Sequence, residues 1–225
     1  MKLPQKTLEH KLIRKGYCQV VGVDEVGMGC LAGPVVVCAV MLDRQFFAQR
    51  YPKLAGIRDS KLLNARQRET LVQELLKIEN LKFKICYAYP KTIDRLNIYQ
   101  ASRAAMRRAV KKLVFSCQLS ASSFKNLKPV SCKLKAVILV DGNKKIPKLD
   151  LPQLTITGGD RKVFSIACAS IIAKVYRDHM MTRYARKYPD YGFEKHKGYG
   201  TKLHQIALTT FGPIPIHRKS FRLEY

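Results

Sequence analysis

The chain has 225 residues, 47% of them hydrophobic and 9% aromatic, which suits one folded domain with or without a small appendage. Lysine and arginine number 42 against 16 acidic residues, so the net charge of +26 indicates a polyanionic partner, with nucleic acid ahead of an anionic membrane. The seven cysteines form no C-x-x-C pair and no apolar run reaches membrane-span length, which excludes a zinc or disulfide framework and a membrane span.

The basic segment 1–16 lacks an apolar signal region, and we expect a cytosolic protein. Residues 20–42 then read as two buried β-branched strands joined by a glycine-rich turn. Asp24 and Glu25 stand together near the end of the first strand, where adjacent side chains point to opposite faces. A solvated pair is the ordinary interpretation, but Gly27 and Gly29 directly afterwards suit close approach of another group.

The segment 58–78 is predicted to be a helix that Ser60 caps, with leucines on one face. Residues 81–89 alternate lysine with apolar residues, the period of a half-exposed strand, so the first three strands form a meander interrupted by a helix.

From Pro90 to about residue 114 the pattern is helical, and one side of it is basic. A charged face is usually only solvated, but no acid occurs between Asp94 and Asp141, which favours a track for phosphates. Residues 116–135 are rich in serine and lysine, and we expect a long surface loop there.

Residues 136–143 form a short, continuously apolar run that ends in Asp141, Gly142 and Asn143. Such a run predicts a strand buried on both faces and paired in parallel. Open α/β sheets bind ligands at the carboxyl ends of parallel strands, although a turn aspartate before glycine is a common alternative. Residues 153–157 are an expected edge strand.

The longest predicted helix covers residues 160–188, with Asp160 as its cap and a buried first half. Ser170, Lys174, Arg177 and Asp178 form one polar stripe along it, either an ordinary surface salt bridge or part of a site. The following segment 191–204 is rich in Gly, Tyr and Lys, and a tyrosine between glycines can stack on a sugar or base or merely cover the core.

Four carboxylates therefore lie on the best-buried predicted elements: Asp24, Glu25, Asp141 and Asp178. Oxygen ligands without a Cys or His pattern favour Mg²⁺ or Mn²⁺, and two such ions can promote in-line attack on a phosphodiester. The sequence has no Walker A, G-x-S-x-G or G-x-G-x-x-G motif. These residues predict a metal nuclease or a related phosphoryl-transfer enzyme without naming its substrate.

The chain resembles the type 2 ribonucleases H, specifically the bacterial ribonuclease HII family. The resemblance runs in family order from about residue 17 to 220, through GVDEVGMGCLAGPVVVCAV, DSKLL, IDRLNIYQASRAAM, ILVDGN, SIACASIIAKVYRDHMM and YGFEKHKGYGTKLH. It implies a ribonuclease H-like α/β fold, with a mixed five-stranded central sheet flanked by helices and a small helical C-terminal extension. The catalytic domain would be residues 17–190, and residues 191–225 would hold a substrate-contacting loop and the extension.

The resemblance also implies cleavage of the RNA strand in RNA–DNA hybrids and incision 5′ of single ribonucleotides in duplex DNA, leaving 3′-hydroxyl and 5′-phosphate ends. It assigns the metal-binding catalytic carboxylates to Asp24, Glu25, Asp141 and Asp178, with two ions expected when substrate is bound. The junction-sensing tyrosine matches Tyr199. We also expect substrate contacts from residues near these motifs, in a monomer without a membrane partner: Gly27, Met28, Gly29, Lys61, Asn143 and Lys197.

One departure concerns the glycine turn, where the family usually has Gly-Arg-Gly and this chain has Gly27, Met28 and Gly29, with Cys30 where proline is common. Met28 has no forked, charged donor, so we expect weaker binding of the ribonucleotide phosphate. Two alternatives stay open: a non-catalytic basic nucleic-acid binder, and a nuclease of the same fold with another substrate.

Overall fold

The computed structural model describes residues 3–122 and 135–222, and its centre is a mixed five-stranded sheet with the order β3-β2-β1-β4-β5. Strands β1 (Gln19–Val26), β2 (Val35–Asp43) and β3 (Leu81–Ala88) form an antiparallel meander. Strand β4 (Ala136–Asp141) pairs in parallel with β1, and β5 (Gln153–Ile156) pairs in parallel with β4 at the edge. The predicted meander, parallel strand and edge strand are confirmed.

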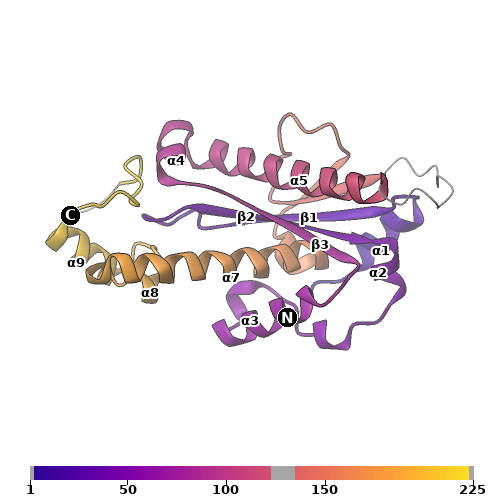
Figure 1. Cartoon of the computed structure of the whole chain (residues 1–225), viewed down its shortest axis with the longest axis horizontal. Helices are drawn as coiled ribbons and strands as arrows, with labels where there is room; N and C mark the ends of the chain where they lie inside the picture. Colours follow the sequence, from indigo (N-terminus) through magenta and orange to yellow (C-terminus); the bar gives the residue numbers. More distant parts are fainter. Residues whose placement is uncertain (1–2, 123–134, 223–225) are drawn as a thin grey trace.

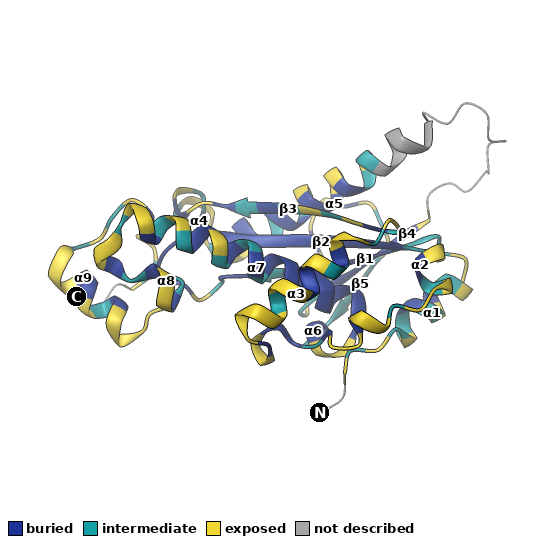
Figure 2. Ribbon diagram, turned by 60° about the horizontal axis from the view of Figure 1, so that its bottom comes forward, coloured by how far each residue is buried: buried dark blue, intermediate teal, exposed yellow. Residues whose placement is uncertain are grey.

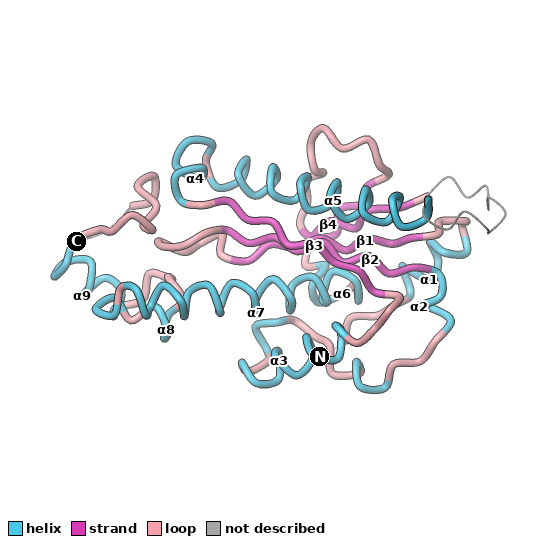
Figure 3. Tube along the Cα trace, in the orientation of Figure 1, coloured by secondary structure: helices cyan, strands magenta, loops and turns pink. Residues whose placement is uncertain are grey.

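Helices cover both faces of this sheet (Figures 1 and 3). Helix α5 (Ile98–Ser122) packs on β2 and β3 on one face, and α7 (Phe164–Lys187) packs on β1 and β2 on the other, with α3 (Ala65–Leu76) against it. The remaining helices are α1 (Thr7–Arg14), α2 (Arg44–Ala48), α4 (Pro90–Leu96), α6 (Gly159–Lys162), α8 (Phe193–His196) and α9 (Lys202–Phe211). Within the described residues, no helix is both long and apolar enough to span a membrane.

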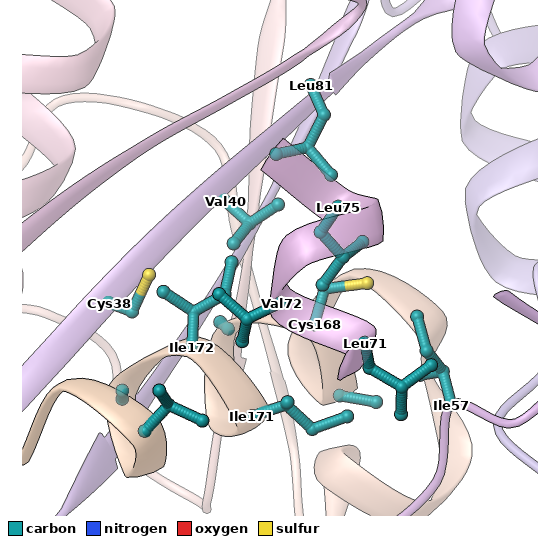
Figure 4. Close-up of a cluster of buried hydrophobic side chains, with 14 of the residues drawn as sticks. Cys38, Val40, Ile57, Leu71, Val72, Leu75, Leu81, Cys168, Ile171 and Ile172 are labelled. Atoms are coloured by element: carbon teal, nitrogen blue, oxygen red, sulfur yellow. The ribbon is translucent and has the colours of Figure 1, made fainter. Parts of the chain in front are cut away.

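The core follows from the alternation of side chains along β1. Val21 and Val23 point into the cluster under α5, whereas Val20 faces the other side of the sheet. On that side, β2, α3 and α7 share the largest apolar cluster, which includes Cys38, Val40, Leu75, Cys168 and Ile172 (Figure 4). Both central strands and the first half of α7 are buried, as predicted (Figure 2). Cys38 and Cys168 are free core thiols, as expected for reduced cysteines.

Gly22 sets the distance between β1 and α7. A Cβ added at this position would lie 2.3 Å from the backbone carbon of Ser165, near the start of α7. Real Cβ atoms do not approach backbone that closely, so only glycine lets the helix lie directly on the central strand. The close approach brings Ser170, one turn further along α7, to the end of β1 where Asp24 lies.

Four predicted helix boundaries were wrong. Asn64, not Ser60, caps α3, because its side chain and that of Gln67 form a reciprocal capping box. The basic helix breaks at Asn97, which takes a positive φ of 63° and accepts a hydrogen bond from Gln100 N. The same helix continues to Ser122, into the predicted loop 116–135, of which residues 123–134 lie outside the described residues.

The fourth boundary concerns Asp160, which caps no helix. It lies inside the short helix α6, whose N-cap is Gly158 with a left-handed φ of 65°. Val163 takes an extended conformation and separates α6 from α7. The break places Asp160 on a separate short helix, and its side chain lines the cleft together with Asp141 from the end of β4.

The chain after α7 packs on the end of that helix, where α8 and α9 share a small apolar cluster with Met181 and Tyr191. Figure 1 shows this small helical extension at the end of the molecule opposite α1 and α2. The helix α1, which the sequence analysis did not predict, docks through Glu9, a buried carboxylate whose Oε1 accepts a hydrogen bond from Ser165 N at 2.9 Å. The division at residue 190 stays a prediction.

Candidate active site

A cleft of about 270 Å³ opens where the parallel strands β1 and β4 end. The predicted residues that line it are Asp24, Glu25, Gly27, Met28, Gly29, Lys61, Asp141 and Tyr199. Side chains from α6, α7 and the turn before α3 complete the wall: Ser60, Asp160, Ser170 and Lys174. Segments that are far apart in the sequence thus meet at the carboxyl ends of the parallel strands, as expected for ligand sites in open α/β sheets.

Asp24 and Glu25 reach the cleft from opposite faces of β1. Asp24 is buried on the α7 side, where its Oδ1 accepts the N–H of Glu25 at 2.7 Å and Ser170 lines the same cleft. Burial raises the pKa of Asp24 well above its usual range, and the negative charges of Glu25 and Asp141 raise it further. This carboxyl therefore lies in a site that opposes its negative charge.

Glu25 points towards α5. Burial raises the pKa of Glu25 to about 7, against the opposing effect of the Arg103 guanidinium, and Asp141 adds to the rise. Its Oε2 is buried without a hydrogen-bond partner in the described residues. A buried, unpaired carboxylate oxygen is costly in a protein of this charge unless a cation binds it.

Asp141 and Asp160 face each other across the ends of β4 and β5. Asp141 Oδ1 accepts the backbone N–H of Gly159 at 2.7 Å, which ties the end of β4 to the first residue of α6. Burial raises the pKa of Asp160, and so do the nearby charges of Asp141 and Asp59. Lys61 also lines the cleft, and its Nζ lies 4.0 Å from Asp160 Oδ2.

Asp160 is the site residue that the sequence analysis missed. We interpreted it as a helix cap, although it follows the predicted strand 153–157 through two glycines. The rule that selected Asp141, an acid just beyond the carboxyl end of a parallel strand, applies equally to Asp160. Its place on a separate short helix could not be found from periodicity, because the break at Val163 leaves no gap in the apolar pattern.

Asp178, the fourth predicted carboxylate, does not line the cleft. Its Oδ1 accepts from Lys174 Nζ at 2.7 Å, and its Oδ2 lies 3.4 Å from Arg68 Nη2. Two cations already compensate this half-buried carboxylate, so it has little capacity left for a metal ion. The expectation that Asp178 joins the other carboxylates is corrected here. It orients Lys174, which does line the cleft.

Two predicted substrate contacts also lie elsewhere. Lys197 Nζ donates to Thr182 Oγ1 at 3.0 Å and to the carbonyl oxygen of Glu194 at 2.9 Å, and its own carbonyl accepts from Arg177. It is thus a structural lysine of the loop, which takes a positive φ there. Asn143 is exposed two residues beyond β4 and does not line the cleft.

Tyr199 forms the outer wall of the cleft and keeps 39% of its surface exposed. Its backbone forms an antiparallel bridge with Cys30, and its ring lies 5.9 Å from both Lys174 Nζ and Arg177 Cζ. The loop that carries it needs Gly198, because a Cβ at its positive φ would lie 2.5 Å from Ala32 O. An aromatic ring fixed this way can stack on a sugar or base.

The carboxylates of the cleft fit divalent cations in their chemistry. They are hard oxygen ligands, and burial and neighbouring acids disfavour the negative charges of Asp24 and Glu25. One of their oxygens, Glu25 Oε2, is buried without a hydrogen-bond partner in the described residues. As placed, no three His, Cys, Asp or Glu side chains of residues 3–122 and 135–222 converge around one point. Mg²⁺ usually takes one or two carboxylates and leaves its other positions to water and substrate phosphate.

Three neighbouring histidines, His196, His204 and His217, support the backbone of Tyr199. His217 Nδ1 accepts from Ile214 N, so its Nε2–H donates to His204 Nε2 at 3.0 Å. His204 Nδ1–H in turn donates to the carbonyl oxygen of Tyr199 at 2.9 Å, and His196 stacks on His204 at 4.4 Å between ring centroids. Burial lowers the pKa of all three imidazoles, that of His204 to about 4, so this chain of hydrogen bonds needs neutral rings.

The histidine chain is expected to make the fold acid-sensitive. Histidine has an ordinary pKa of 6.5, and that of His204 is lowered to about 4. Between these two pH values the folded state therefore binds fewer protons than the unfolded state. Stability from these rings is therefore complete above pH 6.5 and is lost as the pH falls towards 4. Urea denaturation at pH 7.5, 6, 5 and 4.5 measures this, and a His204→Gln variant should flatten the profile. An equal loss in the variant would contradict the assignment.

Comparison with known proteins identifies the family. Residues 21–224 match the family model for Ribonuclease HII. Ribonuclease HII of Caldicellulosiruptor saccharolyticus is 44% identical over 214 residues, which cover 95% of this chain and 92% of that protein. Ribonuclease HII of Chlorobium phaeobacteroides is 44% identical over 203 residues, 90% of this chain and 89% of that protein. The chain belongs to the ribonuclease HII family. It is accordingly a ribonuclease H, a hydrolase, and the family supports activity on RNA–DNA hybrids.

Solved structures confirm the ribonuclease H-like fold. Ribonuclease H2 from Pyrococcus horikoshii OT3 superposes with a TM-score of 0.68 at 25% identity and covers 92% of this chain and 95% of its own. Bst-RNase HIII, solved in complex with Mn²⁺, gives a TM-score of 0.64 at 18% identity, with 92% and 68% of the two chains covered. The latter likeness concerns the fold alone.

Proposed function

We propose that this ribonuclease HII-family chain is a metal-dependent endonuclease that cleaves the RNA strand of RNA–DNA hybrids and incises 5′ of single ribonucleotides embedded in duplex DNA. The products carry 3′-hydroxyl and 5′-phosphate ends. The observation that carries the proposal is that Asp24, Glu25, Asp141 and Asp160 all line one cleft. The raised pKa values of Asp24, Glu25 and Asp160 and the orphaned Glu25 oxygen support cation binding there.

In this proposal the four carboxylates hold Mg²⁺ or Mn²⁺, and a pair of such ions supplies an activated water and charge stabilisation at the leaving oxygen. Mn²⁺ is also the ion named for the Bst-RNase HIII structure. The other residues bind and orient the substrate. Lys61 and Lys174 place positive charge at the rim for the phosphates, and the Tyr199 ring stacks against the nucleotide at the junction.

The basic face of α5 supports a nucleic-acid substrate. Lys111 and Lys112 are exposed on it, as is Arg108, and no acid occurs between Asp94 and Asp141. Such a surface binds the phosphate backbone without reading sequence. The charge therefore explains affinity for a duplex, whereas the cleft at the end of β1 determines where it is cut.

The direct test uses a labelled DNA duplex with one ribonucleotide, a continuous RNA–DNA hybrid and an all-DNA duplex. Incision on the 5′ side of the ribonucleotide is expected with Mg²⁺ or Mn²⁺, with none in chelator and none in Asp141→Asn. Salt-sensitive binding of all three duplexes without incision of any would instead establish the non-catalytic binder. Cleavage of the all-DNA duplex would establish a nuclease of the same fold with another substrate.

A further inference from the structure

Arg218 is a fully buried arginine that binds the glycine turn and does not line the cleft. Its Nε, Nη1 and Nη2 donate to the carbonyl oxygens of Gly33, Met28 and Gly27, at 3.0, 2.9 and 2.6 Å. Its backbone N–H donates to Leu31 O at 2.9 Å. Arg218 forms no ion pair with any carboxylate of the described residues. The partners of this buried cation are thus backbone carbonyls of one turn.

These contacts fix the direction of two peptide groups. In a trans peptide, the C=O and the N–H point in opposite directions, and the described chain has no cis peptide. The carbonyl of Gly27 shares its peptide with the N–H of Met28, and the carbonyl of Met28 shares its peptide with the N–H of Gly29. Because Arg218 holds both carbonyls, both N–H groups point away from its guanidinium, and the residues that carry them, Met28 and Gly29, line the cleft.

The two N–H groups are free donors in the described part of the chain, where neither has a backbone or side-chain acceptor. They lie beside Glu25, at the end of β1. Position 27 requires glycine for two reasons: its φ is 97°, and a Cβ there would lie 2.3 Å from Arg177 Nε. Arg177 is thus a second buried arginine that packs against the same turn. Its side chain donates to the carbonyls of Ala32, Pro34 and Lys197.

We propose that Arg218 is the positioning residue for ribonucleotide discrimination, because it aims the N–H groups of Met28 and Gly29 at the 2′-hydroxyl and the neighbouring phosphate. The inference rests on the proposed function above. A deoxynucleotide at the same place leaves a desolvated donor without an acceptor, which disfavours binding. The C-terminal segment therefore takes part in specificity without touching the substrate.

The test compares the dissociation constants of two duplexes, one with a single ribonucleotide and one all-DNA, with Ca²⁺ in place of Mg²⁺. Arg218→Met is expected to lose about tenfold or more of the preference for the ribonucleotide, the worth of one or two hydrogen bonds. Arg218→Lys retains the charge but not the fork, so its preference should fall between the two.

Two controls separate positioning from charge and from stability. Lys219→Met removes the same charge from the exposed neighbouring residue and should weaken both duplexes alike. Leu208→Ala opens a cavity in α9, away from the turn, and should lower the melting temperature while the preference stays unchanged. A preference lost equally in Leu208→Ala would overturn the inference, since general loosening would then suffice.

Amide NMR of the wild-type chain keeps the inference testable if both Arg218 variants fail to fold. The Met28 and Gly29 amide signals should shift with the ribonucleotide duplex and not with the all-DNA duplex. Equal shifts with both duplexes, or full preference in a folded Arg218→Met variant, would overturn the role of Arg218 alone. A wild-type chain that neither prefers the ribonucleotide nor incises beside it would instead refute the proposed function.

Discussion

The Asp160→Asn variant is expected to lose more than about 100-fold in incision rate, whereas Asp178→Asn should lose less than about tenfold. Residues that only support a metal ligand typically contribute 10- to 100-fold, so a direct ligand should exceed that range. Asp160 lines the cleft beside Asp141, while Asp178 is paired with Lys174 and Arg68. Single-turnover incision of the one-ribonucleotide duplex at saturating Mg²⁺ measures both variants.

Thermal unfolding of the same two variants gives an independent readout. Burial and the charges of Asp141 and Asp59 raise the pKa of Asp160, so its ionised form costs stability above its ordinary pKa of 3.8. Asp160→Asn should therefore melt no lower than wild type at pH 7. Asp178→Asn removes the partner of two cations and should melt lower. Loss of activity in Asp178→Asn with an active Asp160→Asn would restore the assignment made from sequence.

Replacement of Gly22 by Ala is expected to cost more than about 3 kcal/mol of unfolding free energy, the upper end of ordinary overpacking. The new Cβ would meet the backbone of Ser165 at 2.3 Å, and backbone cannot rotate away as a side chain can. Because α7 would be pushed off β1, Ser170 should also separate from Asp24. Urea denaturation measures the cost, and incision by the folded fraction measures the damage to the site.

Gly56→Ala is the matched control for Gly22→Ala. A Cβ at Gly56 would meet no atom within 4 Å, and the residue does not require a positive φ. The same substitution should there be neutral or slightly stabilising, because alanine restricts the unfolded chain. Equal destabilisation of the two variants would mean that α7 can shift on β1, contrary to the packing described.

Local patterns were enough to predict most of the sheet. The apolar run of β4 predicted its parallel pairing, and the alternation in β3 predicted its half-exposed place in the meander. Asp24, Glu25 and Asp141 were found because each stands at the end of a recognisable strand. These predictions depend on a few consecutive residues and on how a strand presents its side chains.

Features that depend on tertiary contacts could not be predicted in the same way. Asp178 belongs to an apparent polar stripe, but Arg68 from α3 lies against it and neutralises it. Lys197 and Tyr199 share one motif, yet the backbone turns the lysine towards Thr182 and the tyrosine towards the cleft. The contacts of Arg218 could not be predicted from the sequence, because its partners are backbone carbonyls, which every residue has.

The role proposed for Arg218 also bears on when the molecule can become selective during its synthesis. Gly27 and Met28 emerge from the ribosome early, but the side chain that holds their carbonyls follows 191 and 190 positions later. The sheet pairs β1, β2 and β3 can form well before that point, since they involve only residues up to Ala88. Nascent chains should therefore bind polyanions through their charge first, and acquire discrimination only after Arg218 has been synthesised.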